Sequence, residues 1–329
     1  MNAVTLTTAD PIALPGVDHG ARRLAVLGRV KLPTTMALLE GLGLRAGMRC
    51  LDVGCGSGAI TLAMASVVGP TGQVVGFDHN KAVLRWAVDA AHREHVTQAT
   101  FCTADVSDLD ADGCYDLVFA RFLLSRVPNP DDALDRMVRA LRPGGIVVVE
   151  DEEFAGQFCH PRSAAFDRFA ELYAAALRRR GGDPEIGPEL PGRLDAHGLE
   201  SVGVNVVQPT FRQGEGKRLP ALTMAHLGPE LEAHHIADLD EVDHLTAQLE
   251  ELALDDTSIV GLPRVYQCWG RRPARARSPG GRPEAVARAA RRRRRQERNS
   301  LSVAPAPQYP PAGDHQHDRR RRARRAHRT

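Results

Sequence analysis

The sequence lacks paired cysteines, long apolar runs and, over most of its length, an excess of basic charge. Its six cysteines are scattered without a C-x-x-C pair, which excludes a zinc site or disulfide scaffold of ordinary spacing and favours the reduced thiols of a cytoplasmic protein. No stretch approaches the roughly 18 apolar residues of a membrane helix, and no basic segment followed by an apolar one begins the chain, so neither a membrane span nor export is expected.

Basic charge is concentrated in the last part of the chain. Residues 271–329 contain 19 arginines and four acidic residues, a net of +15, although the whole chain has a net charge of only +2. This leaves 24 of the 43 basic and 37 of the 41 acidic residues for residues 1–270, a net of −13. An acidic body has no general affinity for nucleic acid, so DNA is not an expected partner.

The two ends of the chain differ in composition from its centre. Residues 273–329 are rich in Arg and Pro and cannot bury a core, which predicts a disordered tail. Such a tail suits RNA binding, but 40 Arg against 3 Lys in the whole chain also fits an out-of-frame extension of a GC-rich gene. Residues 1–19 are polar and predict a flexible arm, which leaves residues 20–272 for the folded domain.

The segment with the clearest chemical meaning is residues 51–58, which read LDVGCGSG, between an apolar strand and an apolar helix. Glycine takes positive φ at little cost and lets a ligand lie almost against the backbone. Gly54, Gly56 and Ala59 also fit the G-x-G-x-x-G/A turn of dinucleotide-binding proteins, so a nicotinamide-dependent oxidoreductase stays open. Asp52 favours a different ligand, because a carboxylate at the strand end repels a diphosphate and suits a sulfonium or an ammonium.

Two further predicted strands also end near a carboxylate. Asp78 closes the strand at 73–78, where it can accept both hydroxyls of a ribose, and Asp105 follows the strand at 99–103. Doubly wound sheets bind ligands at the carboxyl edge of their strands, so Asp52, Asp78 and Asp105 are predicted to share one site.

With Asp52 included, the glycine segment resembles the motif of class I S-adenosylmethionine (SAM) dependent methyltransferases. The LRPGG turn at 141–145, before an apolar strand, resembles the subgroup that methylates small molecules and quinones. The resemblance covers about residues 20–210 and the last strand, at 264–269. It implies an α/β fold with a doubly wound, Rossmann-like sheet of seven mostly parallel strands in the order 3-2-1-4-5-7-6, the last strand antiparallel.

This resemblance also implies a cofactor and its contacts. SAM would lie across the glycine turn, with Asp78 at the ribose, Asp105 at the adenine and Asp52 near the methionine moiety. A backbone N–H next to Asp105 would meet a ring nitrogen of the adenine. No metal is expected. The predicted cofactor-binding residues are Asp52, Gly54, Cys55, Gly56, Gly58, Asp78, His79, Asp105, Val106 and Arg121.

The catalytic residues are less clearly marked. Many small-molecule relatives carry a histidine where this chain reads SRV at 125–127, and Arg126 stays protonated, so it is no base. Glu152, His160 and His226 are the candidates for proton transfer. The expected reaction is an in-line methyl transfer to a small-molecule acceptor, on oxygen, nitrogen or carbon. The absence of N-P-P-Y or D-P-P-Y after the fourth strand disfavours methylation of bases.

Apolar periodicity predicts helices at 20–30, 32–42 and 163–180. A longer insertion at 215–260, before the last strand, contains an apparent capping box of Asp238 and Glu241 and is interpreted as a helical lid over the acceptor. Two other functions stay open beside the oxidoreductase: an RNA methyltransferase that uses the basic tail, and a SAM-binding protein without methyl transfer. The sequence does not indicate an oligomeric state.

Overall fold

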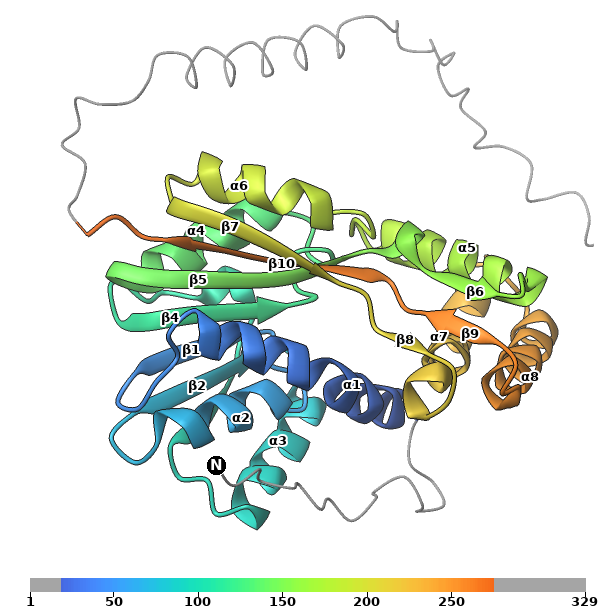
Figure 1. The fold of residues 1–329 in the computed structure, drawn as a ribbon, viewed down its shortest axis with the longest axis horizontal. Coiled ribbons are helices and arrows are strands. Elements are labelled where there is room, and N and C mark those ends of the chain that lie inside the picture. Colours follow the sequence, from blue (N-terminus) through green and yellow to red (C-terminus); the bar gives the residue numbers. More distant parts are fainter. Residues whose placement is uncertain (1–18, 275–329) are drawn as a thin grey trace, which may run out of the picture. The chain divides into compact units, whose positions relative to one another are not determined.

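The computed structural model describes residues 19–274, the part of the chain drawn in colour in Figure 1. Almost all of the predicted arm and tail, and with them the predicted RNA-binding segment, lie outside the described residues. Within residues 19–274, no helix has the length and apolar character that a membrane span requires.

A seven-stranded sheet forms the centre of the domain, in the order β3-β2-β1-β4-β5-β10-β7 (Figure 1). The strand β10 pairs antiparallel with both of its neighbours, and the pairs formed by β1 to β5 are all parallel. The predicted order, with an antiparallel last strand between the fifth and sixth, is therefore confirmed. The strands are β1 (Arg49–Val53), β2 (Gln73–Asp78), β3 (Ala99–Thr103), β4 (Tyr115–Arg121), β5 (Leu141–Glu153), β7 (Glu200–Val207) and β10 (Arg264–Arg271).

Helices cover both faces of this sheet because consecutive residues of its central strands, which point to opposite faces, are apolar. Leu117 and Phe119 of β4 pack in one core cluster with residues of α1 and α2, whereas Val118 of the same strand packs in another with residues of α4 and α6. The helices around the sheet are α1 (His19–Gly41), α2 (Ala59–Val68), α3 (Lys81–Arg93), α4 (Pro130–Ala140) and α6 (Leu190–Ala196).

The prediction of two helices before the first strand is wrong, because α1 is continuous across Pro33. Its N-terminal half packs on α7 and its C-terminal half on α2. Val26 belongs to the core beside α7, and Leu39 belongs to the core against the sheet. Packing at both ends thus outweighs the hydrogen bond that a proline removes from a helix interior.

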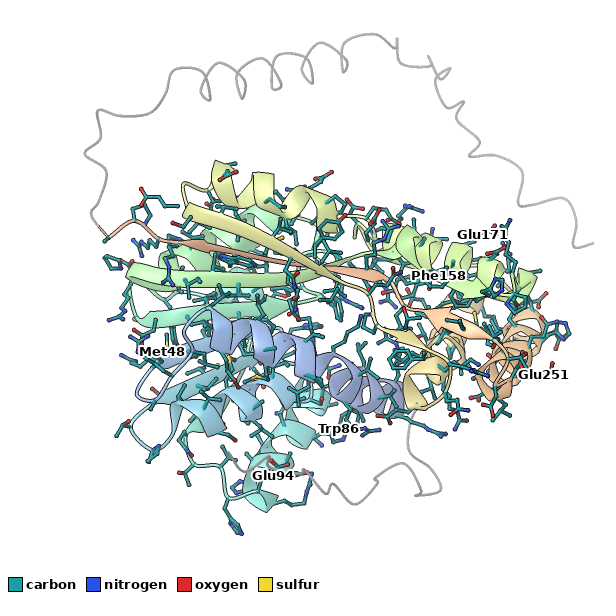
Figure 2. The ribbon with its side chains drawn as sticks, viewed as in Figure 1. Met48, Trp86, Glu94, Phe158, Glu171 and Glu251 are labelled. Atoms are coloured by element: carbon teal, nitrogen blue, oxygen red, sulfur yellow. The ribbon has the colours of Figure 1, made fainter. Side chains whose placement is uncertain are left out.

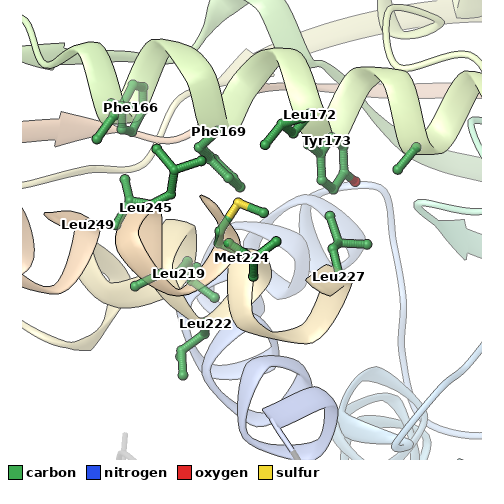
Figure 3. Packing of buried hydrophobic residues seen from close by; sticks show 14 of the residues in the cluster. Phe166, Phe169, Leu172, Tyr173, Leu219, Leu222, Met224, Leu227, Leu245 and Leu249 are labelled. Carbon is green, nitrogen blue, oxygen red and sulfur yellow. The ribbon is translucent and has the colours of Figure 1, made fainter. Parts of the chain in front are cut away.

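A second core lies beside the sheet and is built mainly from helices, as Figure 3 shows. Phe166, Phe169 and Tyr173 of α5 pack against residues of α7 and α8, among them Met224 and Leu245. The predicted long helix and the helical character of the insertion are confirmed. The helices are α5 (Ala164–Arg179), α7 (Leu219–Ala233) and α8 (Leu239–Leu254).

A small antiparallel sheet in the order β6-β9-β8 borders this second core. Its strands are β6 (Phe158–His160), β8 (Thr210–Phe211) and β9 (Ile259–Gly261). Strands of two or three residues show no alternation that a sequence pattern can reveal, and this sheet was not predicted.

The predicted capping box at the start of α8 is only half formed. The Asp238 side chain accepts a hydrogen bond from the backbone N–H of Glu241 at 2.8 Å, as expected. The Glu241 carboxylate instead accepts from the Arg168 guanidinium at 2.8 Å, which links α8 to α5. A tertiary ion pair therefore replaces the reciprocal bond of the box.

Candidate functional site

The turn after β1 opens toward a cavity. Gly54, Gly56 and Gly58 all have positive φ, at 74°, 54° and 80°. The backbone N–H groups of Gly54 and Cys55 both donate to the carbonyl of Phe77, which fixes the turn against the end of β2. A Cβ added at Gly56 would meet no atom within 4 Å, so the space in front of this residue is open to a ligand.

Gly58, by contrast, does not line the cavity. A Cβ added there would lie 2.7 Å from the Cβ of Ala87 and 3.1 Å from the Phe101 ring. This glycine allows α2 and α3 to approach one another, and its position gives no support to a direct ligand contact.

Asp52 is buried at the base of the cavity, with 2% of its surface exposed. The Thr61 hydroxyl, on α2, donates to Asp52 Oδ2 at 2.6 Å. Burial raises the pKa of Asp52 to about 6, against the opposing effects of the Thr61 hydrogen bond and the Arg121 charge.

Asp78 is already engaged by backbone groups. Its Oδ2 accepts from the N–H of Gly56 at 2.9 Å, and its Oδ1 accepts from the N–H of Asn80 at 2.8 Å. Each carboxylate oxygen has further lone pairs, so two ligand hydroxyls can still be accepted. The neighbouring His79 ring is largely exposed and lies 3.6 Å from Asp78 Oδ1.

Asp105 precedes a short 3-10 turn, Val106–Asp108, and its Oδ1 accepts from the N–H of Ser107 at 2.8 Å. This hydrogen bond is the main reason that the pKa of Asp105 lies below its ordinary value, so the carboxylate is ionised near neutral pH. Both Asp105 and Val106 line the cavity.

The three strand-end carboxylates therefore meet at one cavity of about 570 Å³, as predicted. Its walls come from the carboxyl ends of the first strands, from α1 and α3, and from one residue of α7. Trp86, on α3 and labelled in Figure 2, also lines it. Of the predicted cofactor residues, those that line it are Asp52, Gly54, Cys55, Gly56, Asp78, His79, Asp105, Val106 and Arg121.

The resemblance left open whether the helical segment before β1 helps to form this cavity or only covers the sheet. Arg23, Leu24, Leu27 and Gly28 all line it. Their helical spacing is visible in the sequence, but nothing in that spacing indicates that this face of α1 turns toward the glycine turn rather than toward the sheet.

A buried polar network lies behind the end of β4. The Arg121 guanidinium donates to the Thr35 hydroxyl at 3.2 Å, and that hydroxyl donates to Glu150 Oε2 at 2.7 Å. Gln267 of β10 donates to Glu150 Oε1 at 2.6 Å. Burial raises the pKa of Glu150, against the charge of Arg121. This network holds Arg121 at the cavity wall.

Phe122, directly after β4, was not predicted from the sequence to lie at this site. It is a bulky residue at φ 55°, in the left-handed region, and its N–H donates to the carbonyl of Glu150 at 2.8 Å. Its ring lies 5.7 Å from the Arg121 guanidinium carbon and 6.0 Å from Lys31 Nζ. Strained backbone of this kind persists where the surrounding structure enforces it, and here it directs an aromatic ring to the cavity.

The structure does not bring the three catalytic candidates together. His226, on α7, lines the cavity. Glu152 is buried in an adjoining hollow, where the Tyr173 hydroxyl donates to its Oε1 at 3.0 Å. His160 is exposed on β6 and lines neither this cavity nor the two adjoining hollows.

The other acids near Glu152 have structural partners. Asp151 accepts from the N–H of Ser125 at 3.1 Å, and burial raises the pKa of Asp151 to about 7. Glu153 forms an ion pair of 2.6 Å with Arg264. In residues 19–274, no group of three His, Cys, Asp or Glu side chains has the arrangement of a metal site.

Comparison with known proteins gives this site a family. A family described as a methyltransferase domain matches residues 44–177, which include β1 to β5 and the glycine turn. Residues 44–177 thus match a methyltransferase domain, in line with the resemblance seen in the sequence.

Curated relatives that match the chain are also methyltransferases. The ubiquinone/menaquinone biosynthesis C-methyltransferase UbiE of Pseudomonas fluorescens (strain Pf0-1) is 35% identical over 141 residues, which are 42% of this chain and 53% of that protein. The demethylmenaquinone methyltransferase of Staphylococcus aureus (strain JH9) is 36% identical over 112 residues, 34% of this chain and 46% of that protein. The chain thus spans about half the length of the curated relatives it matches.

Two bacterial structures share the fold over more of the chain. A candidate methyltransferase of Bacillus halodurans C-125 has a TM-score of 0.51 at 19% identity, covering 73% of this chain and 99% of that one. The YcgJ protein of Bacillus subtilis has a TM-score of 0.50 at 17% identity, covering 72% and 97%.

The residues of the methyltransferase domain fit SAM. The cavity has the size of an ordinary small-molecule site, and Gly56 leaves open space beside the backbone. Asp52, Asp78 and Asp105 place three carboxylates in this cavity, beside Arg23, Arg121 and Arg126, and these acids suit a nucleoside that carries a sulfonium.

Proposed function

We propose that this chain transfers the methyl group of SAM to a small-molecule acceptor, on oxygen, nitrogen or carbon. One observation carries the proposal: three strand-end carboxylates and an open glycine turn line a single cavity. The similarity to enzymes named for quinone biosynthesis supports a quinone-type acceptor. The name of the Pseudomonas relative specifies methyl transfer to carbon.

In this proposal the cofactor residues keep the roles that the resemblance implied. Asp78 accepts the ribose hydroxyls through the lone pairs that the Gly56 and Asn80 amides leave free. Asp105 accepts the adenine amino group while the N–H of Val106 donates to the ring. Asp52, Cys55 and the glycine backbone hold the methionine moiety, with Arg121 at the wall beside α1, where it donates to Thr35.

When bound, SAM supplies a methyl group that is already activated by its sulfonium. The chain therefore has to align the acceptor and exclude water. The apolar side chains of Leu24, Leu27 and Phe122 line part of the cavity and help to exclude water from it. His226 lines the same cavity and is the candidate that lies where an acceptor proton can be taken.

The insertion at 215–260 serves as a lid in this proposal. Its helix α7 packs on α1, and Thr223 of α7 accepts a hydrogen bond from Arg23 of α1 at 2.9 Å. Residues of α1 and His226 of α7 both line the cavity. All six cysteines are free thiols, which supports a reducing, cytoplasmic location.

The experiment is to incubate the purified chain with SAM and a panel of hydroquinones, phenols and amines. We expect S-adenosylhomocysteine (SAH) and a product heavier by one methylene, both detected by mass spectrometry. SAM binding without SAH formation on any acceptor would instead indicate a SAM-binding protein without methyl transfer.

A further inference from the structure

A small hollow of about 40 Å³ adjoins the cofactor cavity, between α1, the end of β5, α5 and α7. Arg23 and Leu27 line both spaces, so the two are neighbours across a single turn of α1. The side chains of the hollow that carry polar groups are Arg23, Lys31, Glu152, Gln157, Tyr173 and Thr223.

Two hydrogen-bond donors in this hollow are buried without a partner. Lys31 Nζ makes no hydrogen bond although Lys31 is only 3% exposed, and Gln157 Nε2 is likewise buried and unpaired. An unpaired ammonium is among the costliest groups to bury. Both donors line the hollow, which is a reason to expect that something other than protein accepts from them.

Cationic side chains outnumber acids around these donors, although Lys31 also faces the carboxylates of Glu152 and Glu150. Lys31 and Arg23 line the hollow itself, and Arg126 approaches from the neighbouring hollow, where its Nη2 donates to the Tyr173 hydroxyl at 3.3 Å. Glu152 is the acid that lines this hollow, and its Oε1 is already engaged by Tyr173. The hollow therefore suits a group with negative charge.

The remaining wall of the hollow is apolar, with Leu27, Phe154, Phe169, Leu219 and Leu262. A volume of about 40 Å³ exceeds the roughly 10–15 Å³ that one water molecule requires in a cavity. The hollow can therefore hold one small polar group of a molecule whose larger part lies in the cofactor cavity.

We propose that the acceptor carries an ionised oxygen on an apolar body, and that Lys31 Nζ and Gln157 Nε2 receive this oxygen in the hollow. A carboxylate, a phenolate and an enolate share this chemistry. This inference rests on the proposed function, since it names the class of acceptor for the same site. Lys31 is then a positioning and specificity residue that fixes the acceptor beside the cofactor cavity.

The test is a calorimetric titration of the chain, saturated with SAH, with 2-naphthoate and with its uncharged analogue 2-naphthamide. We expect the acid to bind at least about tenfold more tightly than the amide, and this preference to disappear in Lys31→Met. Gln157→Leu should reduce the preference in part. The exposed Lys81, on α3, gives a matched control, because Lys81→Met should keep the full preference.

Lys31→Met removes a buried ammonium that makes no hydrogen bond, so the variant is expected to fold. Equal binding of the two probes, absence of naphthoate binding, or an unchanged preference in Lys31→Met would overturn the inference and leave a buried water as the occupant. The affinity for SAH is measured in the same samples and should be unchanged in all variants. Failure of SAH itself to bind wild-type protein would contradict the proposed function instead.

Discussion

The Asp78 carboxylate accepts a hydrogen bond from the backbone N–H of Gly56 at 2.9 Å, across the gap between the end of β2 and the turn after β1. The same carboxylate accepts from the N–H of Asn80 at the start of α3. One side chain thus ties together the two backbone segments that form the floor of the cofactor cavity, and it remains able to accept from a ligand.

Asp78→Ala should therefore weaken SAM binding by at least about tenfold, or roughly 1.4 kcal/mol. The variant loses the ribose contact and also the bond that holds Gly56. The measurement is a calorimetric titration with SAH, which is stable in solution. Asp89→Ala, at an exposed position on the outer side of α3, is the matched control. If Asp78→Ala bound SAH with wild-type affinity, Asp78 would not be a cofactor contact.

Gly56 and Gly58 offer a paired test of ligand contact against packing. Alanine at either position adopts positive φ at a cost of about 1–2 kcal/mol. At Gly56 the added Cβ enters open space in the cavity. The free energy of SAH binding should therefore change more than the free energy of unfolding. At Gly58 it meets Ala87 and Phe101, so the free energy of unfolding should fall by about 2–4 kcal/mol.

The measurements for this pair are urea unfolding and SAH titration of both variants. If Gly56→Ala binds SAH as tightly as the wild type, then the space in front of that glycine is not where the cofactor lies.

Much of the fold and of the cofactor site follows from the sequence because local signals carry them. Residues 51–58 mark a strand, a turn and a helix in one stretch, and the parallel topology then brings Asp52, Asp78 and Asp105 to one edge. Glycine at a position of positive φ and an acid at a strand end are each visible in a window of a few residues.

The acceptor side was not predictable in the same way, because its residues meet only through tertiary packing. Lys31, in the middle of α1, and Gln157, just after β5, come from distant parts of the chain and show no shared pattern. The continuity of α1 across Pro33 depends on contacts with α2 and α7, and the left-handed Phe122 depends on the register of β5.

The raised pKa of Asp151 should make the stability of the fold depend on pH. Burial raises the pKa of Asp151 to about 7, above the ordinary value of 3.8. The folded state therefore binds a proton more tightly than the unfolded state, and the free energy of unfolding contributed by this group falls as the pH rises from about 4 to about 7.

Asp151→Asn should remove this dependence, since the asparagine carbonyl can still accept from the N–H of Ser125. At pH 8 we expect the variant to be about 1–3 kcal/mol more stable than the wild type, and at pH 4 nearly equal to it. Urea unfolding at the two pH values measures this. If the free energies of unfolding of the variant and the wild type differed by the same amount at both pH values, the raised pKa would not belong to Asp151.

Lys217 should be a strong stability determinant of the insertion. Its buried ammonium donates to the carbonyls of Arg212 and Ser258, each at 3.1 Å, and to that of Asp255. Lys217→Met leaves these carbonyls without the ammonium and should lower the free energy of unfolding by about 2–4 kcal/mol.

Thermal or urea unfolding, with the exposed Lys81→Met as control, measures the effect of Lys217→Met. The control should lie within about 0.5 kcal/mol of wild type. A loss of similar size in the control, or none in Lys217→Met, would show that these hydrogen bonds add no net stability.

The most direct test of the account is to titrate the purified chain separately with SAM and with NADPH in a calorimeter. The three carboxylates around the glycine turn attract a sulfonium and repel a diphosphate, so the account predicts saturable binding of SAM at one site and no heat of binding for NADPH. Saturable binding of NADPH, with none of SAM, would contradict it.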